Sequence, residues 1–363
     1  MQPNVKDLSK EQFTSYLREH NQPSYRAAQV WQWLYQKHAV SFDEMSNLSA
    51  ELRAQLEREF SISRLHVARQ SESRDGTTKF LFELADGETI ESVLIPEKDR
   101  LTLCVSTQAG CGFGCAFCAT ALMGLKRNLR ASEIVDQVLE ASRALEGERR
   151  ITHIVLMGMG EPLANYEQTL IALEVLTNAT WGIGISPRRI TLSTVGLVPQ
   201  IKKLMEETRV NLAISLHAAT DELRGKLMPV NRKYSLRQLM DCCRALPIPR
   251  RKRITFEYVL LRGINDSAED AQQLCQLLQG IRCKVNVIPF NPHPGSGFEP
   301  PVPSAIARFG EILQDHGLQV NVRRPRGDDI QAACGQLQGE QGTKDEDGRR
   351  KNEIHPSSFI LHP

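Results

Sequence analysis

The sequence predicts an α/β protein built on a partial βα barrel, preceded by a small helical domain and a β-hairpin extension. Three observations support this fold class. From Leu101 onward, strand-like and helix-like runs alternate; before residue 62, apolar residues repeat at helical spacing; between these regions, two strand-like runs flank a turn. Repeated βα units require a parallel sheet, and six or seven such units suit a full or partial barrel.

The composition is that of an ordinary globular protein. The chain has 363 residues, which is enough for one large α/β domain and a small one. Its formal net charge is only +2, so any RNA site must come from local basic patches. There is no run of about 18 apolar residues, and the N-terminal segment lacks the apolar core of a signal peptide. We therefore expect a cytoplasmic protein without a membrane span.

Residues 1–62 are expected to form a helical domain. Apolar side chains recur at helical spacing, as in the triplet Phe13, Tyr16 and Leu17 and in the series Leu48, Leu52, Leu56 and Phe60. Between them, the segment SYRAAQVWQWLYQKH mixes aromatic and basic residues. A packed helical core explains most of these aromatic rings, and a nucleic-acid face that stacks bases on some of them is the alternative.

Residues 63–100 are expected to form a β-hairpin extension. The runs KFLFEL and TIESVLI flank Asp86-Gly87, a dipeptide that suits a turn with positive φ. On the second run, Glu91 shares one face with apolar residues. Such a carboxylate is a candidate acid or base, because desolvation raises its pKa. The alternative, which periodicity alone favours, is an edge strand whose Glu91 faces water.

Residues 101–338 are expected to form the barrel core. The strand-like runs are LTLCVST, THIVLMG, RITLSTVG, VNLAISLHA, RITFEYVLL, KVNVIPF and LQVNVRR, and helix-like runs such as ASEIVDQVLEASRALE and SLRQLMDCCRAL lie between them. In such a barrel, the chemistry occurs at the C-terminal ends of the strands. Residues 339–363 lose this periodicity and are mostly polar, so we expect a disordered tail and assign it no function.

Three of the nine cysteines lie together in the loop CGFGCAFC, as Cys111, Cys115 and Cys118. An odd, unevenly spaced set is a poor disulfide framework, so these thiols are metal-binding, catalytic or buried. A structural zinc ion needs a fourth ligand, which Cys104 or Cys334 would have to supply in space. The other interpretation is a 4Fe-4S cluster that is held by three thiolates and leaves one iron open to a small molecule.

The spacing Cys-x3-Cys-x2-Cys, with Phe117 before the last cysteine, resembles the radical S-adenosylmethionine (radical SAM) superfamily. The next strand ends in MGMGEP; Leu163 stands where a dinucleotide fingerprint needs a glycine, so that interpretation fails. The segment resembles instead the GGEP-type segment that binds the SAM amino group. The resemblance implies a 4Fe-4S cluster on the three cysteines, with the open iron chelated by SAM. The SAM-binding residues that it implies are Gly160, Glu161, Ser193, Ser215, Leu216, His217 and Asn291.

A narrower resemblance, from about residue 21 to about residue 339, is to the RlmN/Cfr family of RNA methyltransferases. It is carried by YRAAQVWQWLYQK, IESVLIPE, LCVSTQAGCGFGCAFCATALMGLKRNL, MGMGEPL, LSTVGLVP, ISLHA, IPFNP and RGDDIQAACGQL. It implies methylation of carbon 2 of an adenosine in the peptidyl transferase centre of 23S rRNA and of the adenosine 3′ of the anticodon in tRNA. It also identifies residues 1–62 as an RNA-recognition domain.

The same resemblance implies a role for three further residues. Cys334 takes a methyl group from one SAM by displacement, and a radical from a second SAM then removes hydrogen from that methyl group. The resulting carbon radical adds to carbon 2 of adenine and joins protein and RNA. Cys104 is the resolving thiol, which releases the product by forming a transient disulfide with Cys334. Glu91 is the proton acceptor, contrary to the solvent-facing alternative above.

The implied partners are 23S rRNA, tRNA and an electron donor such as flavodoxin or ferredoxin, and a monomer is expected. Several basic clusters converging on the barrel mouth would hold RNA phosphates. The candidate clusters are Lys126, Arg127 and Arg130; Arg188 and Arg189; Arg250 to Arg253; and Arg323, Arg324 and Arg326.

Two alternatives to this function stay open. One is a Cfr-like enzyme that methylates carbon 8 of adenosine with the same cluster and cysteines. The other is a non-catalytic RNA-binding protein that uses its metal site as a staple or a redox sensor.

Overall fold

The structure is a computed structural model that describes residues 2–339, 343, 344, 350 and 351. Its N-terminal region is helical, as predicted. Ser9 begins the first helix with a capping box, and the Phe13 ring stacks on Trp31 in the core of this region with their centroids 4.8 Å apart. The helices are η1 (Val5–Asp7), α1 (Lys10–Glu19), α2 (Tyr25–Tyr35) and α3 (Ala50–Glu59).

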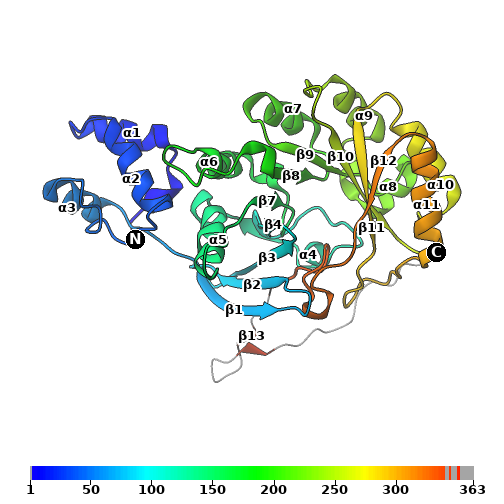
Figure 1. The fold of residues 1–363 in the computed structure, drawn as a ribbon, viewed down its shortest axis with the longest axis horizontal. Coiled ribbons are helices and arrows are strands. Elements are labelled where there is room, and N and C mark those ends of the chain that lie inside the picture. Colours follow the sequence, from blue (N-terminus) through cyan, green and yellow to red (C-terminus); the bar gives the residue numbers. More distant parts are fainter. Residues whose placement is uncertain (1, 340–342, 345–349, 352–363) are drawn as a thin grey trace.

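The N-terminal helices pack beside α5 (Ala131–Arg143) and α6 (Tyr166–Thr177), to one side of the barrel (Figure 1). A buried ion pair joins the two regions, with Lys6 Nζ 2.6 Å from Asp136 Oδ1. The aromatic residues of α2 divide between core and surface. Trp31 and Tyr35 are buried, whereas Trp33 is half-buried beneath the Lys37 ammonium group, 3.7 Å from its ring centroid.

The predicted hairpin is present as β2 (Thr78–Glu83) and β3 (Thr89–Glu97), joined by a turn in which Gly87 has φ of 84°. It belongs to a larger antiparallel unit, because β1 (His66–Glu72) pairs with β2 and β4 (Arg100–Cys104) pairs with β3. Region 63–100 is thus continuous with the main sheet. The sequence did not predict β1, since most of its side chains are exposed and no apolar alternation marks the strand.

The main sheet has the order β1-β2-β3-β4-β7-β8-β9-β10-β11-β12, and the strands from β4 onward run parallel. Its two ends, β1 and β12, are not paired with each other, so the barrel is open, as predicted. The parallel strands after β4 are β7 (His153–Leu156), β8 (Ile190–Thr194), β9 (Asn211–Ser215), β10 (Ile254–Leu260), β11 (Cys283–Pro289) and β12 (Gln319–Val322).

Helices cover the outside of the parallel strands (Figure 1). The helix-like runs of the sequence correspond to α5, α6, α7 (Val198–Glu207), α9 (Leu236–Ala245), α10 (Ala268–Leu277) and α11 (Pro303–Asp315). Shorter elements fill the loops: β5 (Gln108–Gly110), α4 (Ala119–Leu122), β6 (Leu125–Asn128), η2 (Pro162–Asn165), η3 (Pro187–Arg189), α8 (Asp221–Leu227), η4 (Pro229–Arg232) and η5 (Asp328–Ile330).

Two short strands follow the barrel. β13 (Thr343–Lys344) and β14 (Arg350–Lys351) pair antiparallel. Most of the remaining tail, which was predicted to be disordered over residues 339–363, lies outside the described residues. None of the described helices combines the length and apolar character needed to cross a lipid bilayer.

Candidate active site

A cavity of about 170 Å³ opens at the C-terminal ends of the parallel strands. Parallel strands end at the same edge of the sheet, so residues far apart in the sequence meet there. The predicted site residues that line the cavity are Cys118, Gly160, Glu161, Ser193, Ser215, His217, Asn291 and Cys334. Leu216 is fully buried next to this lining, and Glu91, Cys104, Cys111 and Cys115 are outside it.

The cysteine loop is built around β5, β6 and α4. The Cys111 amide donates to Gly124 O, and α4 begins directly after Cys118. Burial raises the pKa of the Cys111 thiol to about 12, and it raises the pKa of Cys115 as well. Cys118 adds to both shifts, so the three thiols lie close enough to interact. None of them forms a disulfide.

The three thiols supply the number and type of ligands that a 4Fe-4S cluster with one open iron requires. Among the residues that the structure describes, no three Cys, His, Asp or Glu side chains are grouped to hold one metal ion. A zinc ion would draw its thiolates to within about 4 Å of one another. A 4Fe-4S cluster binds each thiolate through a different iron and therefore spaces the three thiolates more widely. Of the possible fourth zinc ligands, Cys334 interacts with both Cys104 and Cys118.

The MGMGEP segment follows β7 and packs tightly against the cysteine loop. Gly160 has φ of 95°, and a Cβ atom there would lie 2.4 Å from Gln108 Cβ, so the position requires glycine. Gln108 Oε1 accepts a hydrogen bond from the Glu161 amide. The Glu161 carboxylate accepts from Leu163 N and Val195 N, at 3.0 and 2.8 Å. Burial raises the pKa of Glu161 to about 7.

His217, in the segment after β9, is held in one protonation state. Its Nδ1 accepts a hydrogen bond from the Val259 amide, at 2.9 Å. Burial lowers the pKa of His217 to about 3, so the ring stays neutral near pH 7 and its Nε2 carries the proton. His217 therefore acts as a hydrogen-bond donor. The sequence did not single out Arg224 of α8. Its side chain donates hydrogen bonds to the Ser215 and Leu216 carbonyls and so fixes the backbone just before His217.

Cys334 lies on a segment that three parts of the fold hold in place. Asn291, after β11, donates from Nδ2 to the Cys334 carbonyl at 3.1 Å. The Ala119 amide of α4 donates to Gly335 O at 2.8 Å. The Glu91 carboxylate of β3 accepts from the backbone N–H groups of residues 338 and 339, at 3.0 and 3.3 Å. These contacts place Cys334 in the wall of the cavity, where burial raises the pKa of its thiol.

Glu91 is buried in β3, with β2 and β4 on either side, so the solvent-facing alternative is wrong. Its Oε1 forms an ion pair with Lys79 Nζ at 2.9 Å, and its Oε2 accepts the two backbone hydrogen bonds described above. Both oxygens are therefore occupied, one by Lys79 of β2 and the other by the backbone after Cys334. The role of Glu91 as proton acceptor stays a prediction.

Cys104 ends β4, in the interior of the barrel. Burial raises the pKa of its thiol to about 12, and the nearby Cys334 thiol adds to this effect. The two thiols of the predicted transient disulfide are thus close in space, although 230 positions separate them in the sequence. Both are reduced.

Two further charged residues line the cavity wall; sequence reasoning missed Glu257 and gave Arg323 only as a member of a basic cluster. Glu257 lies within β10, and Arg323 follows β12 directly. Each stands inside or beside a run of strand-forming residues, ITFEYVL and QVNVRR. A charged residue within a buried parallel strand is unusual, and that signal would have identified Glu257.

The basic clusters do not all converge on the barrel mouth. Arg188 and Arg189 precede β8, and residues 250–253 precede β10, so both clusters lie at the N-terminal ends of the strands, opposite the cavity. The expectation is wrong for these two groups. Arg127 pairs with Glu133. Arg323 is the member of the predicted clusters that lines the cavity.

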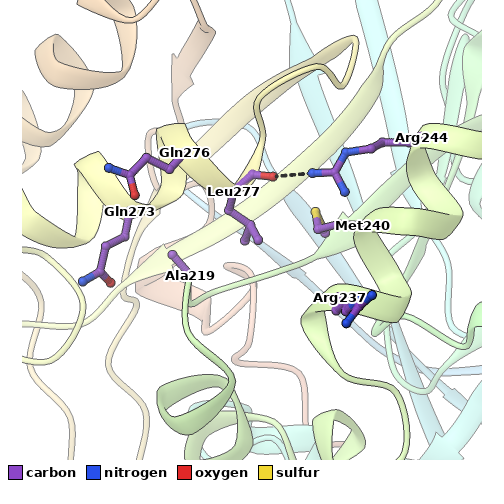
Figure 2. A pocket seen from close by; sticks show the side chains of 7 residues that line it. All are labelled: Ala219, Arg237, Met240, Arg244, Gln273, Gln276 and Leu277. Atoms are coloured by element: carbon purple, nitrogen blue, oxygen red, sulfur yellow. Dashed lines mark hydrogen bonds between the residues drawn. The ribbon is translucent and has the colours of Figure 1, made fainter.

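A second hollow, of about 400 Å³, lies on the outside of the barrel between α9 and α10 (Figure 2). Arg244 donates to Leu277 O there, at 3.3 Å, and both Arg237 and Arg244 pair with Asp241. None of the predicted site residues lines it. Because it lies away from the ends of the strands that carry the predicted site residues, we assign it no part in the chemistry.

The open parallel barrel and its three-cysteine loop define the chain as a radical SAM enzyme, a class that carries a 4Fe-4S cluster and uses SAM. Comparison with known proteins agrees. The Radical SAM superfamily matches residues 105–277, and the "Ribosomal RNA large subunit methyltransferase N-terminal domain" matches residues 3–62. A crystal structure of a radical SAM methyltransferase from Sphaerobacter thermophilus is 45% identical, with a TM-score of 0.87, over 93% of this chain and 100% of that one.

The chain belongs to the RlmN family of dual-specificity RNA methyltransferases. It is 51% identical to the "Dual-specificity RNA methyltransferase RlmN" of Desulfosudis oleivorans, over 92% of this chain and 90% of that protein. It is 52% identical to the RlmN protein of Syntrophobacter fumaroxidans, over 93% of this chain and 98% of that protein. The similarity thus includes the N-terminal helices as well as the barrel.

Proposed function

We propose that the protein methylates carbon 2 of an adenosine in the peptidyl transferase centre of 23S rRNA and of the adenosine 3′ of the anticodon in tRNA, using two SAM molecules per methyl group. Carbon 2 lies between two ring nitrogens and is not a nucleophile, so it cannot attack a sulfonium methyl group directly. The observation that carries the proposal is the position of Cys334 in the wall of the strand-end cavity, with the Cys104 thiol close to it.

In this proposal the residues in and around the cavity divide the tasks of the reaction. Cys111, Cys115 and Cys118 hold the cluster, and Gly160, Glu161, Ser193, Ser215, Leu216, His217 and Asn291 bind SAM. Once bound, these cofactors supply the radical that removes hydrogen from the methylated Cys334 side chain. Cys104 then attacks the Cys334 sulfur and releases the product. Asn291 also orients Cys334 through its hydrogen bond to the Cys334 carbonyl.

We assign RNA recognition to residues 1–62 and the chemistry to residues 101–338. Residues 63–100 are the hairpin unit. The half-buried Trp33, which packs under the Lys37 side chain, offers a ring and a charge suited to RNA. The target base must leave its stack to reach the cavity. We further propose a cytoplasmic monomer that receives electrons from a flavodoxin or ferredoxin.

Mass spectrometry of nucleosides tests this function. The cluster-loaded protein is incubated without oxygen with reductant, SAM bearing a deuterated methyl group, and either tRNA or a 23S rRNA fragment. We expect labelled 2-methyladenosine in both RNAs and 5′-deoxyadenosine in solution. A product of 8-methyladenosine alone would assign the Cfr-like reaction. Absence of 5′-deoxyadenosine from cluster-loaded protein would support the non-catalytic alternative.

SAM affinity should depend on pH through Glu161. In this proposal the Glu161 carboxylate binds the SAM amino group. Because its pKa is about 7, the carboxylate becomes protonated and loses its negative charge as the pH falls through 7. We expect the dissociation constant of SAM to be about tenfold higher at pH 6 than at pH 8, since one proton is linked to binding. Equilibrium dialysis on the cluster-loaded protein measures it. Glu161→Gln should bind weakly at pH 8 and lose this part of the pH dependence; an unchanged profile would contradict the assignment.

A further inference from the structure

We propose that Glu257 is the general base that takes the proton from the Cys334 thiol when Cys334 is methylated. The inference rests on the proposed function, which makes Cys334 the methyl carrier. Only the thiolate form of cysteine is a good nucleophile, and an ordinary thiol is mostly protonated at pH 7. A base within the cavity would remove that barrier.

The position of Glu257 suits this task. It lies within β10, is 7% exposed and lines the cavity together with Cys334. Its Oε1 accepts a hydrogen bond of 2.8 Å from Asn286 Nδ2, the residue beside it on β11. Its Oε2 has no hydrogen-bond partner in the described part of the chain. One oxygen thus fixes the carboxylate, and the other stays available to a group in the cavity.

Arg323 balances the charge of the pair. It follows β12, where its amide donates to Val287 O at 2.8 Å, and its side chain lines the cavity. Burial raises the pKa of both Glu257 and Cys334, and the positive charge of Arg323 opposes this rise by favouring the carboxylate and the thiolate forms. No carboxylate of a described residue pairs with it within 4 Å. As the proton moves, the negative charge passes from Glu257 to Cys334 and stays near Arg323.

The other acid–base groups of the region are already committed. Both oxygens of Glu91 hold Lys79 and the backbone after Cys334, and Glu91 does not line the cavity. Both oxygens of Glu161 accept backbone hydrogen bonds. His217 has its Nδ1 occupied by an amide and stays neutral. Glu257 is therefore the carboxylate in the cavity wall with an uncommitted oxygen. Burial raises its pKa, which makes it a stronger base.

The step balances without an oxidant or a reductant. The bond between the SAM sulfur and its methyl carbon breaks, and a bond forms between that carbon and Cys334 Sγ. The Cys334 S–H proton passes to Glu257. The sulfonium becomes the neutral thioether of S-adenosylhomocysteine as the carboxylate becomes a neutral carboxylic acid, so the net charge is unchanged.

The half-reaction can be measured by itself. The cluster-loaded full chain is mixed with SAM bearing a deuterated methyl group and no reductant, and the labelled Cys334 peptide is followed by mass spectrometry. We expect Glu257→Gln to slow labelling about 100-fold at pH 7, a typical loss for a missing general base. The rate should recover as the pH rises, because the thiol then ionises without help. Glu206→Gln, an exposed change on α7, is the matched control.

The pH recovery separates a base from a structural support. Apart from one another, the charged or titratable groups that interact with Glu257 or Cys334 are Arg323, Lys284, Cys118 and Cys104, and all four are kept in the variant. Glu257→Gln protein that has been methylated slowly at high pH should then transfer its methyl group to RNA at the wild-type rate when reductant is added.

Labelling of Glu257→Gln at the wild-type rate at pH 7 would overturn the inference, and so would a deficit that persists at high pH. A wild-type protein that never labels Cys334 would refute the proposed function itself, and the role of Glu257 with it. A methylated variant that fails to modify RNA would show that Glu257 acts in the later step instead.

Discussion

Replacing Cys334 with alanine is expected to abolish 2-methyladenosine in both tRNA and 23S rRNA. The Cys334 side chain carries the methyl group in the proposed reaction, so the protein has no other route to the product when the sulfur is removed. The expected loss is complete, below the detection limit of nucleoside mass spectrometry, rather than a reduced rate. Both RNAs should be affected alike, because the same cavity serves both.

The control for this variant is Cys275→Ala, since Cys275 is a buried cysteine of α10 that does not line the cavity. It should keep most of its activity, with a modest loss of stability from the small cavity that it creates. Circular dichroism and the iron content of both variants show whether the fold and the cluster are retained. Any 2-methyladenosine made by a folded, cluster-loaded Cys334→Ala protein would contradict the proposed role of Cys334.

Much of the barrel could be predicted from the sequence because its signals are local. The amphipathic repeats of α5, α7 and α9 and the apolar strand runs are read over ten or so neighbouring residues. The spacing of the three cysteines is local too. The meeting of Ser193, His217 and Asn291 followed from topology alone, since parallel strands end at one edge.

What the sequence could not reveal depends on long-range contacts. Whether Glu91 faces water or protein depends on β1 to β4 forming one sheet, which periodicity does not encode. The support that Glu91 gives to the Cys334 segment joins elements distant in the chain. The Arg250 to Arg253 cluster shows an avoidable error: its place just before a strand already puts it at the end opposite the cavity.

Replacing Cys104 with alanine is expected to give a different result, a protein–RNA adduct that persists. Cys104 has no part in forming the bond from the Cys334 methyl carbon to adenine, so that bond should still form. Its release requires a thiolate to attack the Cys334 sulfur, and Cys104 is the buried thiol beside it. We expect close to one RNA per protein in the adduct and almost no free methylated RNA.

Denaturing electrophoresis with labelled tRNA detects this adduct, and ribonuclease digestion followed by mass spectrometry places it on the Cys334 peptide. The double variant Cys104→Ala, Cys334→Ala should form none, which separates a covalent adduct from tight binding. In the wild-type protein, burial raises the pKa of Cys104 to about 12, so little thiolate exists at pH 7 and product release should quicken as the pH rises. Free 2-methyladenosine in RNA from the Cys104→Ala protein, without an adduct, would mean that another thiol resolves the intermediate.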